Sequence, residues 1–81
     1  MANVEQLKLI KQGVERWNQW REQNSNIKPD LSESDLRQAY LQKANLSHAN
    51  LNKVKLQFSN LTGANLKETI LKKAKFQEAN L

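Results

Sequence analysis

Large apolar residues recur at every fifth position from residue 31 to residue 81. The series is Leu31, Leu36, Leu41, Leu46, Leu51, Leu56, Leu61, Leu66, Leu71, Phe76 and Leu81. A small residue, most often alanine, stands two positions before almost every member of the series. Residues five apart share no face of an α-helix, which turns about 100° per residue, nor of a strand, whose side chains alternate. The chain is therefore expected to turn once per repeat, with the large and small residues pointing inward.

Stacked repeats of this kind predict a solenoid with an aliphatic interior and a polar exterior. The repeats are expected over residues 29–81, after a separate segment over residues 1–28. The residue between each inward pair points outward and is often asparagine. We expect these asparagines to accept hydrogen bonds from neighbouring main chain and to steady the corners; they are Asn45, Asn50, Asn60, Asn65 and Asn80.

The repeats share a sequence motif as well as a spacing. Ala-Asn-Leu occurs at residues 44–46, 49–51, 64–66 and 79–81. This A-N-L-x-x pattern resembles the pentapeptide-repeat proteins. The resemblance implies an all-β solenoid, a right-handed quadrilateral β-helix with four repeats per coil and here about 2.5–3 coils. Residues 12–21 also resemble the N-terminal helical lead-in of bacterial, often cyanobacterial, members.

The segment before the repeats has a different periodicity. Its apolar residues recur at intervals of three and four and form one stripe, comprising Val4, Leu7, Ile10, Val14, Trp17 and Trp20, with Arg21 as the alternative to Trp20 at the last position. This pattern predicts a single helix over residues 4–23, with Asn3 and Gln6 as its capping box. We expect the helix to cap the first coil through Val14, Trp17 and Trp20, since the end of a solenoid needs covering. A membrane-surface helix, with Lys8, Lys11, Arg16 and Arg21 as its polar face, is the less favoured interpretation.

Composition leaves little room for catalysis. The chain has 81 residues, no cysteine and one histidine, which excludes disulfides, cysteine-ligated zinc and a thiol nucleophile. His48 follows Ser47 but has no positioned acid, and the two glycines form no phosphate-binding loop. We therefore expect a protein that is not an enzyme, with no catalytic residues, metal site or cofactor. With no apolar stretch near the length of a membrane span and no evident signal peptide, it is expected to be cytoplasmic.

The net charge is +5, and its location depends on how the repeats stack. With four repeats per coil, residues twenty apart lie in columns about 4.8 Å apart along the stack. One column is then Asp35–Lys55–Lys75, and its neighbour is Glu33–Lys53–Lys73 with Lys72 beside it. We call Lys53, Lys55, Lys72, Lys73 and Lys75 the lysine columns. A solvated face with ion pairs at its first rungs is favoured over a basic patch for nucleic acid, acidic protein or anionic lipid.

Three outward positions are apolar, and one end of the stack is open. Tyr40, Phe58 and Ile70 are expected on different faces or corners and thus not to form one patch. Phe58 and Ile70 join the lysine columns as the candidate partner surface. Leu66, Leu71, Phe76 and Leu81 are expected to lie exposed at the last coil, so the solenoid either continues or is covered there by a second copy or another partner.

Three classes of function remain. The favoured one is a non-enzymatic scaffold that binds a protein partner of unknown identity. The resemblance suggests a second, because some family members mimic DNA and protect DNA gyrase from inhibitors. The repeats here carry eight Lys and Arg against five Asp and Glu, a net charge of +3, which argues against a phosphate mimic. The third class, binding of nucleic acid or a membrane surface by the lysine columns, has the weakest support.

Overall fold

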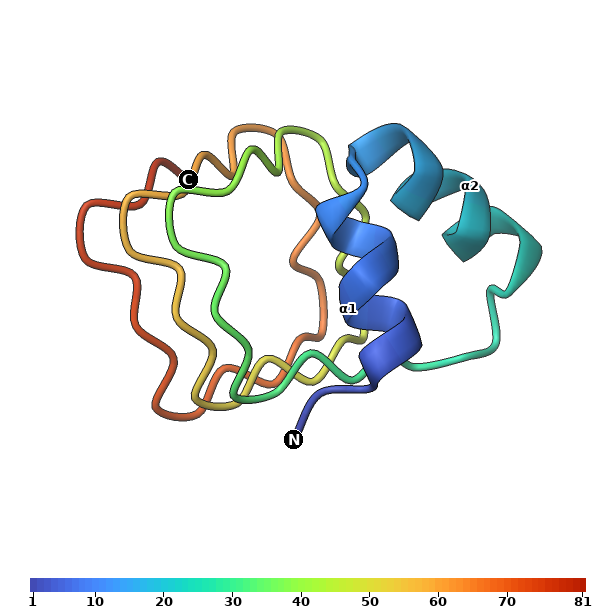
Figure 1. Cartoon of the computed structure of the whole chain (residues 1–81), viewed down its shortest axis with the longest axis horizontal. Coiled ribbons are helices and arrows are strands. Elements are labelled where there is room, and N and C mark those ends of the chain that lie inside the picture. Colours follow the sequence, from blue (N-terminus) through green and yellow to red (C-terminus); the bar gives the residue numbers. More distant parts are fainter.

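Two short helices, and not one, precede the repeats. In the computed structural model, which describes all 81 residues, α1 spans Val4–Lys11 and α2 spans Val14–Gln23. The prediction of one helix over residues 4–23 is wrong because the chain breaks at Gly13. This residue has φ 125° and ψ 156°, a conformation that only glycine adopts without strain. The break lets the two helices fold against each other over one end of the repeats (Figure 1).

The capping of α1 differs in part from the predicted box. Asn3 Oδ1 accepts a hydrogen bond from the Gln6 N–H at 3.1 Å, as expected for an N-cap. The Gln6 side chain does not return to Asn3. Its Oε1 accepts from the Asp30 N–H at 2.7 Å, so it joins the helix to the first repeat. Neither helix has the length and apolar character needed to cross a membrane.

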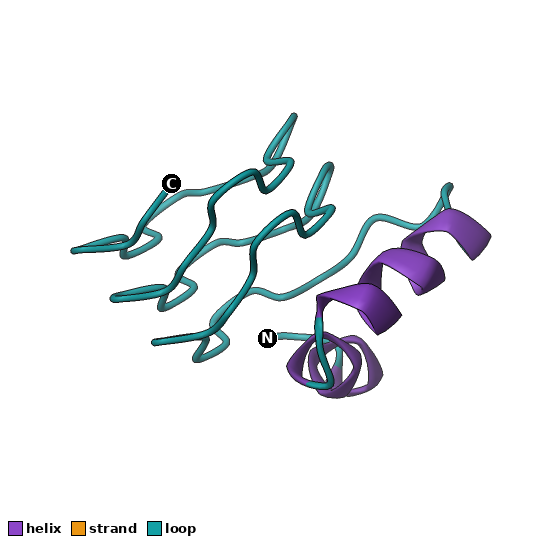
Figure 2. Cartoon of the chain, turned by 90° about the horizontal axis from the view of Figure 1, so that it is seen from above, coloured by secondary structure: helices purple, strands orange, loops and turns teal.

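The repeats wind into coils that pair residues twenty apart. Seven isolated parallel bridges make these pairings: Asp30 with Asn50, Asp35 with Lys55, Tyr40 with Asn60, Asn45 with Asn65, Asn50 with Ile70, Lys55 with Lys75, and Asn60 with Asn80. Figure 2 shows the coils stacked beside one another, with the helices at one end. The expected all-β class differs from what is seen, because the named elements are two helices and no bridge extends into a strand. Two of the five residues in each repeat form a turn, which leaves too little extended chain for a longer ladder.

A left-handed residue closes each turn. Every fifth residue from Glu33 to Glu78 has φ between 58° and 72°, and only Gly63 among them is glycine. The outward Asn or Asp compensates for this strain by accepting a hydrogen bond from the N–H two residues later. Asn50 Oδ1 accepts from Asn52 at 3.1 Å, and Asn60 Oδ1 accepts from Thr62 at 3.0 Å. Asn45 and Asn65 make the same contact, so the predicted corner role is confirmed for these four asparagines.

The core is the interior of the stack. The large residues from Leu31 to Leu61 are all buried, whereas Leu66 and Phe76 are half-buried. Leu71 is 36% exposed and Leu81 is 68% exposed, so burial decreases toward the last coil. Small residues share the interior. Where such a residue is polar it bonds locally, as in Ser59, whose hydroxyl donates to the Leu56 carbonyl at 2.7 Å.

Candidate functional site

The second helix seals one side of the first coil, residues 29–48. Trp17 is fully buried, and its Nε1 donates to the Asn45 carbonyl at 2.8 Å. The Asn18 amide accepts from the Asn45 N–H at 2.8 Å and donates to the Lys43 carbonyl at 3.0 Å. Side chains of α2 thus take the main-chain positions that a preceding coil would occupy. Trp20 is half-buried, with its ring 5.3 Å from that of Trp17, and Val14 is half-buried against the core.

Arg21 extends this seal, which agrees with its place as the alternative to Trp20 on the apolar stripe and not with the polar face of a membrane-surface helix. Its guanidinium is buried, and Nη2 donates to the Ser47 carbonyl at 2.7 Å, while Nη1 donates to the Ile27 carbonyl at 3.2 Å. Burial lowers the pKa of Arg21. Arg21 and Asn18 were not among the predicted cap residues because polar side chains normally mark the solvated face of a helix. Arg21 had a signal, its spacing of four from Trp17 on the stripe, whereas Asn18 had only a position one residue beyond a tryptophan.

Four residues of the first coil bridge to the second coil: Asp30, Asp35, Tyr40 and Asn45. On the side that faces the cap, the main-chain groups of two of them are hydrogen-bonded by cap residues, and those of the other two are unpaired. At Asp30, the N–H donates to Gln6 and the carbonyl accepts from the Asn3 N–H at 2.9 Å. At Asn45, Asn18 and Trp17 make the equivalent contacts. The N–H and carbonyl groups of Asp35 and Tyr40 have no hydrogen-bond partner in the chain.

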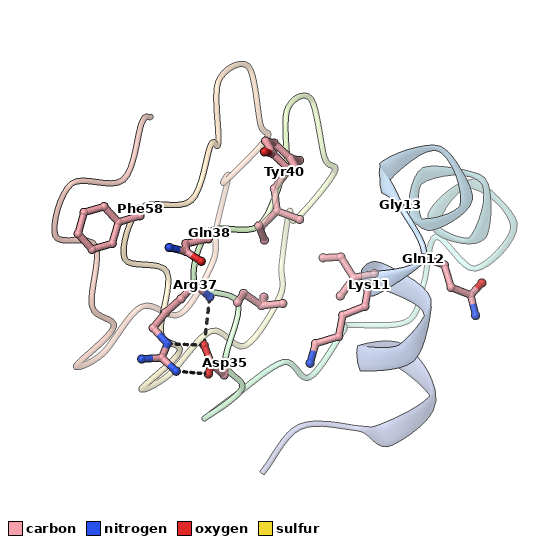
Figure 3. A pocket seen from close by; sticks show the side chains of 12 residues that line it. Lys11, Gln12, Gly13, Asp35, Arg37, Gln38, Tyr40 and Phe58 are labelled. Atoms are coloured by element: carbon pink, nitrogen blue, oxygen red, sulfur yellow. Dashed lines mark hydrogen bonds and ion pairs between the residues drawn. The ribbon is translucent and has the colours of Figure 1, made fainter.

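A groove of about 760 Å³ lies over these two open positions. It runs between the end of α1, at Ile10 to Gly13, and residues 35–41 of the first coil, with Phe58 at its outer wall (Figure 3). Tyr40 is 80% exposed and Phe58 is 59% exposed. Both residues line the groove, Phe58 from a corner and Tyr40 from a neighbouring face. Ile70 is exposed but does not line it.

The lysine columns lie on the second and third coils, on adjacent surface positions. Lys55 and Lys75 form a bridge, and the Lys53 N–H donates to the Lys72 carbonyl at 2.9 Å. All five lysines are exposed, and none has a carboxylate within 4.0 Å. The expected ion pairs at the first rungs do not form. Asp35 pairs instead with Arg37 at 2.7 Å, and Glu33 with the N-terminal ammonium at 3.2 Å, since these cations lie closer.

The Asp35–Arg37 pair predicts a pH dependence. Hydrogen bonds from the Arg37 guanidinium and from its main-chain N–H lower the pKa of Asp35 to about 2. A carboxyl whose folded-state pKa is below its unfolded value stabilises the fold above about pH 4 and loses that contribution as the pH falls through about 2. Asp35→Asn keeps an acceptor for the Arg37 N–H but removes the charge. We expect its urea midpoint to lie below that of the parent near pH 7 and the difference to close below about pH 2. A constant difference across this range would contradict the ion pair.

His48 has an acidic neighbour, so the expectation that no acid is positioned beside it is wrong. Glu68 follows His48 by twenty residues, the spacing at which one coil stacks on the next. The His48 Nδ1 lies 3.1 Å from Glu68 Oε2, and both side chains are well exposed. The Ser47 hydroxyl donates to Asn45 Oδ1 at 2.7 Å and accepts from Arg21, and it makes no hydrogen bond to His48. The serine and histidine are therefore engaged in separate contacts. No group of three or more histidine or acidic side chains lies close enough together to hold a metal ion.

Comparison with family models identifies the repeats. The model for pentapeptide repeats matches residues 30–67 and 49–81, with eight copies. The chain belongs to the pentapeptide-repeat family. The two matches together span more than half of this pentapeptide-repeat chain, and they leave α1 and α2 outside. Searches of curated proteins and of solved structures found no match.

Proposed function

We propose that this pentapeptide-repeat protein is a non-enzymatic scaffold that binds an acidic protein partner through its lysine columns. In this proposal the repeats form the right-handed, four-sided β-helix of the family and act as a rigid support in the cytoplasm. The parallel bridges at a spacing of twenty residues support the four-repeat coil. The rigidity matters because charges held on fixed rungs lose little entropy when a partner binds.

The observation that carries the proposal is the absence of acidic neighbours around the lysine columns. Asp35 is engaged by Arg37 and Glu33 by the N-terminus, so five exposed lysines share two columns without neutralisation. Like charges held this close repel each other, and an acidic partner relieves that repulsion. Phe58 is the one aromatic residue of the candidate partner surface, which is too few for a platform on which the bases of a single strand stack and favours an acidic protein over nucleic acid.

A titration with defined probes tests this proposal. The probes are a fluorescein-labelled peptide of about twenty residues rich in glutamate, a DNA duplex of similar charge, and vesicles containing phosphatidylserine. We expect the peptide to bind with an affinity that falls as salt rises, and about tenfold more weakly to Lys55→Glu/Lys75→Glu. Lys8→Glu/Lys28→Glu is the matched control, because it changes the net charge equally but alters exposed residues before the repeats.

Each remaining outcome of the titration contradicts the proposal. Tighter binding of DNA or vesicles, with the same sensitivity to the column variant, would assign the surface to nucleic acid or anionic lipid. Equal losses in both double variants would reduce the effect to net charge. Absence of binding by every probe would remove the lysine columns as a binding site. A gyrase supercoiling assay is expected to show no effect, since the positive repeats are poor mimics of a phosphate backbone.

The C-terminal end of the stack supports a second contact, with another copy of the chain. Leu71 and Leu81 are exposed there beside the half-buried Phe76, which places apolar surface on one end of the stack. We expect sedimentation velocity to show a dimer that Phe76→Glu converts to monomer, while Gln77→Glu leaves it intact. The Phe76 variant is compared by circular dichroism to show that it is still folded. A parent that stays monomeric at high concentration would contradict this contact.

A further inference from the structure

The two closed positions of the first coil show what its main-chain edge accepts. At Asp30, an N–H of the cap donates to the carbonyl at 2.9 Å and a side-chain oxygen accepts from the N–H at 2.7 Å. At Asn45 the corresponding distances, from Trp17 and to Asn18, are both 2.8 Å. These contacts repeat the pattern within the stack, where Asn50 donates to the Pro29 carbonyl and accepts from Leu31. The cap thus completes the edge by imitating an extended chain.

At Tyr40 the same donor and acceptor are present and nothing in the chain meets them. Its N–H and carbonyl have no partner toward the cap, while Tyr40 is bridged to Asn60 on the other side. An unpaired edge of this kind is a template for an added extended segment. The main-chain N–H and carbonyl of Asp35 also lack partners, but the Asp35 carboxylate, bound by Arg37, lies beside them on the outer surface.

The groove over this edge is lined on both sides by residues that the side chains of such a segment can contact. Ile10 of the cap and Leu36 of the first coil line it, and the exposed rings of Tyr40 and Phe58 rise at its margin (Figure 3). Two large, exposed aromatic side chains beside an open cleft are unusual for a polar repeat surface and mark a place where apolar groups bind.

The charge of the groove selects among peptides. Lys11 lines it from the end of α1 and has no carboxylate within 4.0 Å. Asp35 and Arg37 also line it but satisfy each other at 2.7 Å. The uncompensated charge in the groove is therefore positive, and its complement is a carboxylate.

We infer that this groove binds an extended peptide in which apolar residues alternate with acidic ones. The peptide main chain pairs with the N–H and carbonyl of Tyr40 and adds one more rung to the stack. Because side chains of an extended segment alternate in direction, one set faces the interior and packs against the buried residues Ile10 and Leu36. The other set lies on the outer side with the rings of Tyr40 and Phe58, where its carboxylates reach Lys11. This site is independent of the lysine columns, which lie on other rungs and need no main-chain pairing.

Selection from a phage-displayed library of random peptides of about eight residues, roughly 26 Å when extended, provides the probe. The full chain is immobilised, and an enriched peptide is synthesised with a fluorescent label. We expect enriched sequences to alternate apolar residues with Asp or Glu, and the labelled peptide to bind with a measurable anisotropy change. Methylation of its main-chain nitrogens is expected to weaken binding about tenfold or more by removing donors to the edge.

Matched variants locate the bound peptide. Lys11→Glu and Phe58→Ser are each expected to weaken binding about tenfold, since they remove the charge and one aromatic wall. Lys8→Glu, on the same helix but outside the groove, and Ile70→Ser, an exposed apolar residue elsewhere, are expected to leave binding unchanged. In an amide NMR spectrum, the Tyr40 signal is expected to shift on peptide addition.

Four results would overturn the inference. They are failure to enrich any peptide, enrichment of peptides rich in lysine, binding that tolerates main-chain methylation, and binding that is insensitive to Lys11→Glu and Phe58→Ser. If Lys55→Glu/Lys75→Glu weakens peptide binding and the groove variants do not, the peptide binds to the lysine columns and the groove is rejected. If only the groove variants weaken binding, the peptide binds in the groove alone.

Discussion

Replacing Leu51 with lysine is expected to unfold the repeats. Leu51 is fully buried in the middle of the stack, and its main-chain N–H donates to the Ile70 carbonyl at 2.8 Å. An ammonium at this position has no carboxylate to pair with, and burying it costs several kcal/mol, out of a total stability of about 5–15 kcal/mol for a domain. At about 25 °C the circular dichroism spectrum should already be that of an unfolded chain, and heating should show no cooperative melting transition.

Two variants separate burial of charge from other effects of substitution. Gln42→Lys adds the same group at an exposed turn position and is expected to melt like the parent. Leu51→Met preserves volume and apolarity and is expected to cost less than about 1.5 kcal/mol. A soluble Leu51→Lys variant with the melting temperature of the parent would show that Leu51 does not point into the core.

Trp17→Ala is expected to have the next largest effect, because it removes both the packing and the hydrogen bond of the cap. The substitution empties a fully buried site and leaves the Asn45 carbonyl without its donor. Truncating a buried tryptophan costs about 3–5 kcal/mol. In a domain of this size the melting temperature should fall by more than about 10 °C, measured by differential scanning calorimetry.

Neighbouring substitutions test whether the position of Trp17 matters. Trp20→Ala removes a half-buried ring from the same helix and is expected to cost clearly less. Trp17→Phe keeps most of the apolar packing and should lie between the parent and Trp17→Ala, since the Asn45 carbonyl still loses its donor. Equal melting temperatures for Trp17→Ala and the parent would contradict a structural role for the cap.

The repeats were the most predictable part of the molecule. A period of five excludes both regular elements, so the alternation of large and small residues specified which side chains point inward before any coordinates were known. The corner role of Asn50 and Asn60 followed from the chemistry of a short amide two residues before a turn N–H. Both inferences depend only on neighbours in the sequence, and local geometry repeats faithfully along a stack.

The cap and its surroundings were predicted less well. The apolar stripe identified Trp17, but the polar residues Asn18 and Arg21 contribute as much to the contact with the first coil. Gly13 lay within the single helix predicted over residues 4–23, whereas its φ of 125° makes it the bend between two helices. An apolar stripe shows which face of a helix avoids water. It does not show which main-chain groups of another segment need hydrogen-bond partners, and those groups decided the roles of Asn18 and Arg21.

By itself, the sequence determined the inward residues and the positive sign of the surface, which follow from spacing and composition. The stacking of positions twenty apart was expected from the resemblance to the pentapeptide-repeat family, which implies four repeats per coil. Only the tertiary structure decided that the ion pairs of Asp35 and Glu33 form elsewhere than the lysine columns, and that Tyr40 and Phe58 line one groove. The reason is that flexible charged side chains take the nearest partner in space, and a groove depends on where the helices come to rest against the first coil.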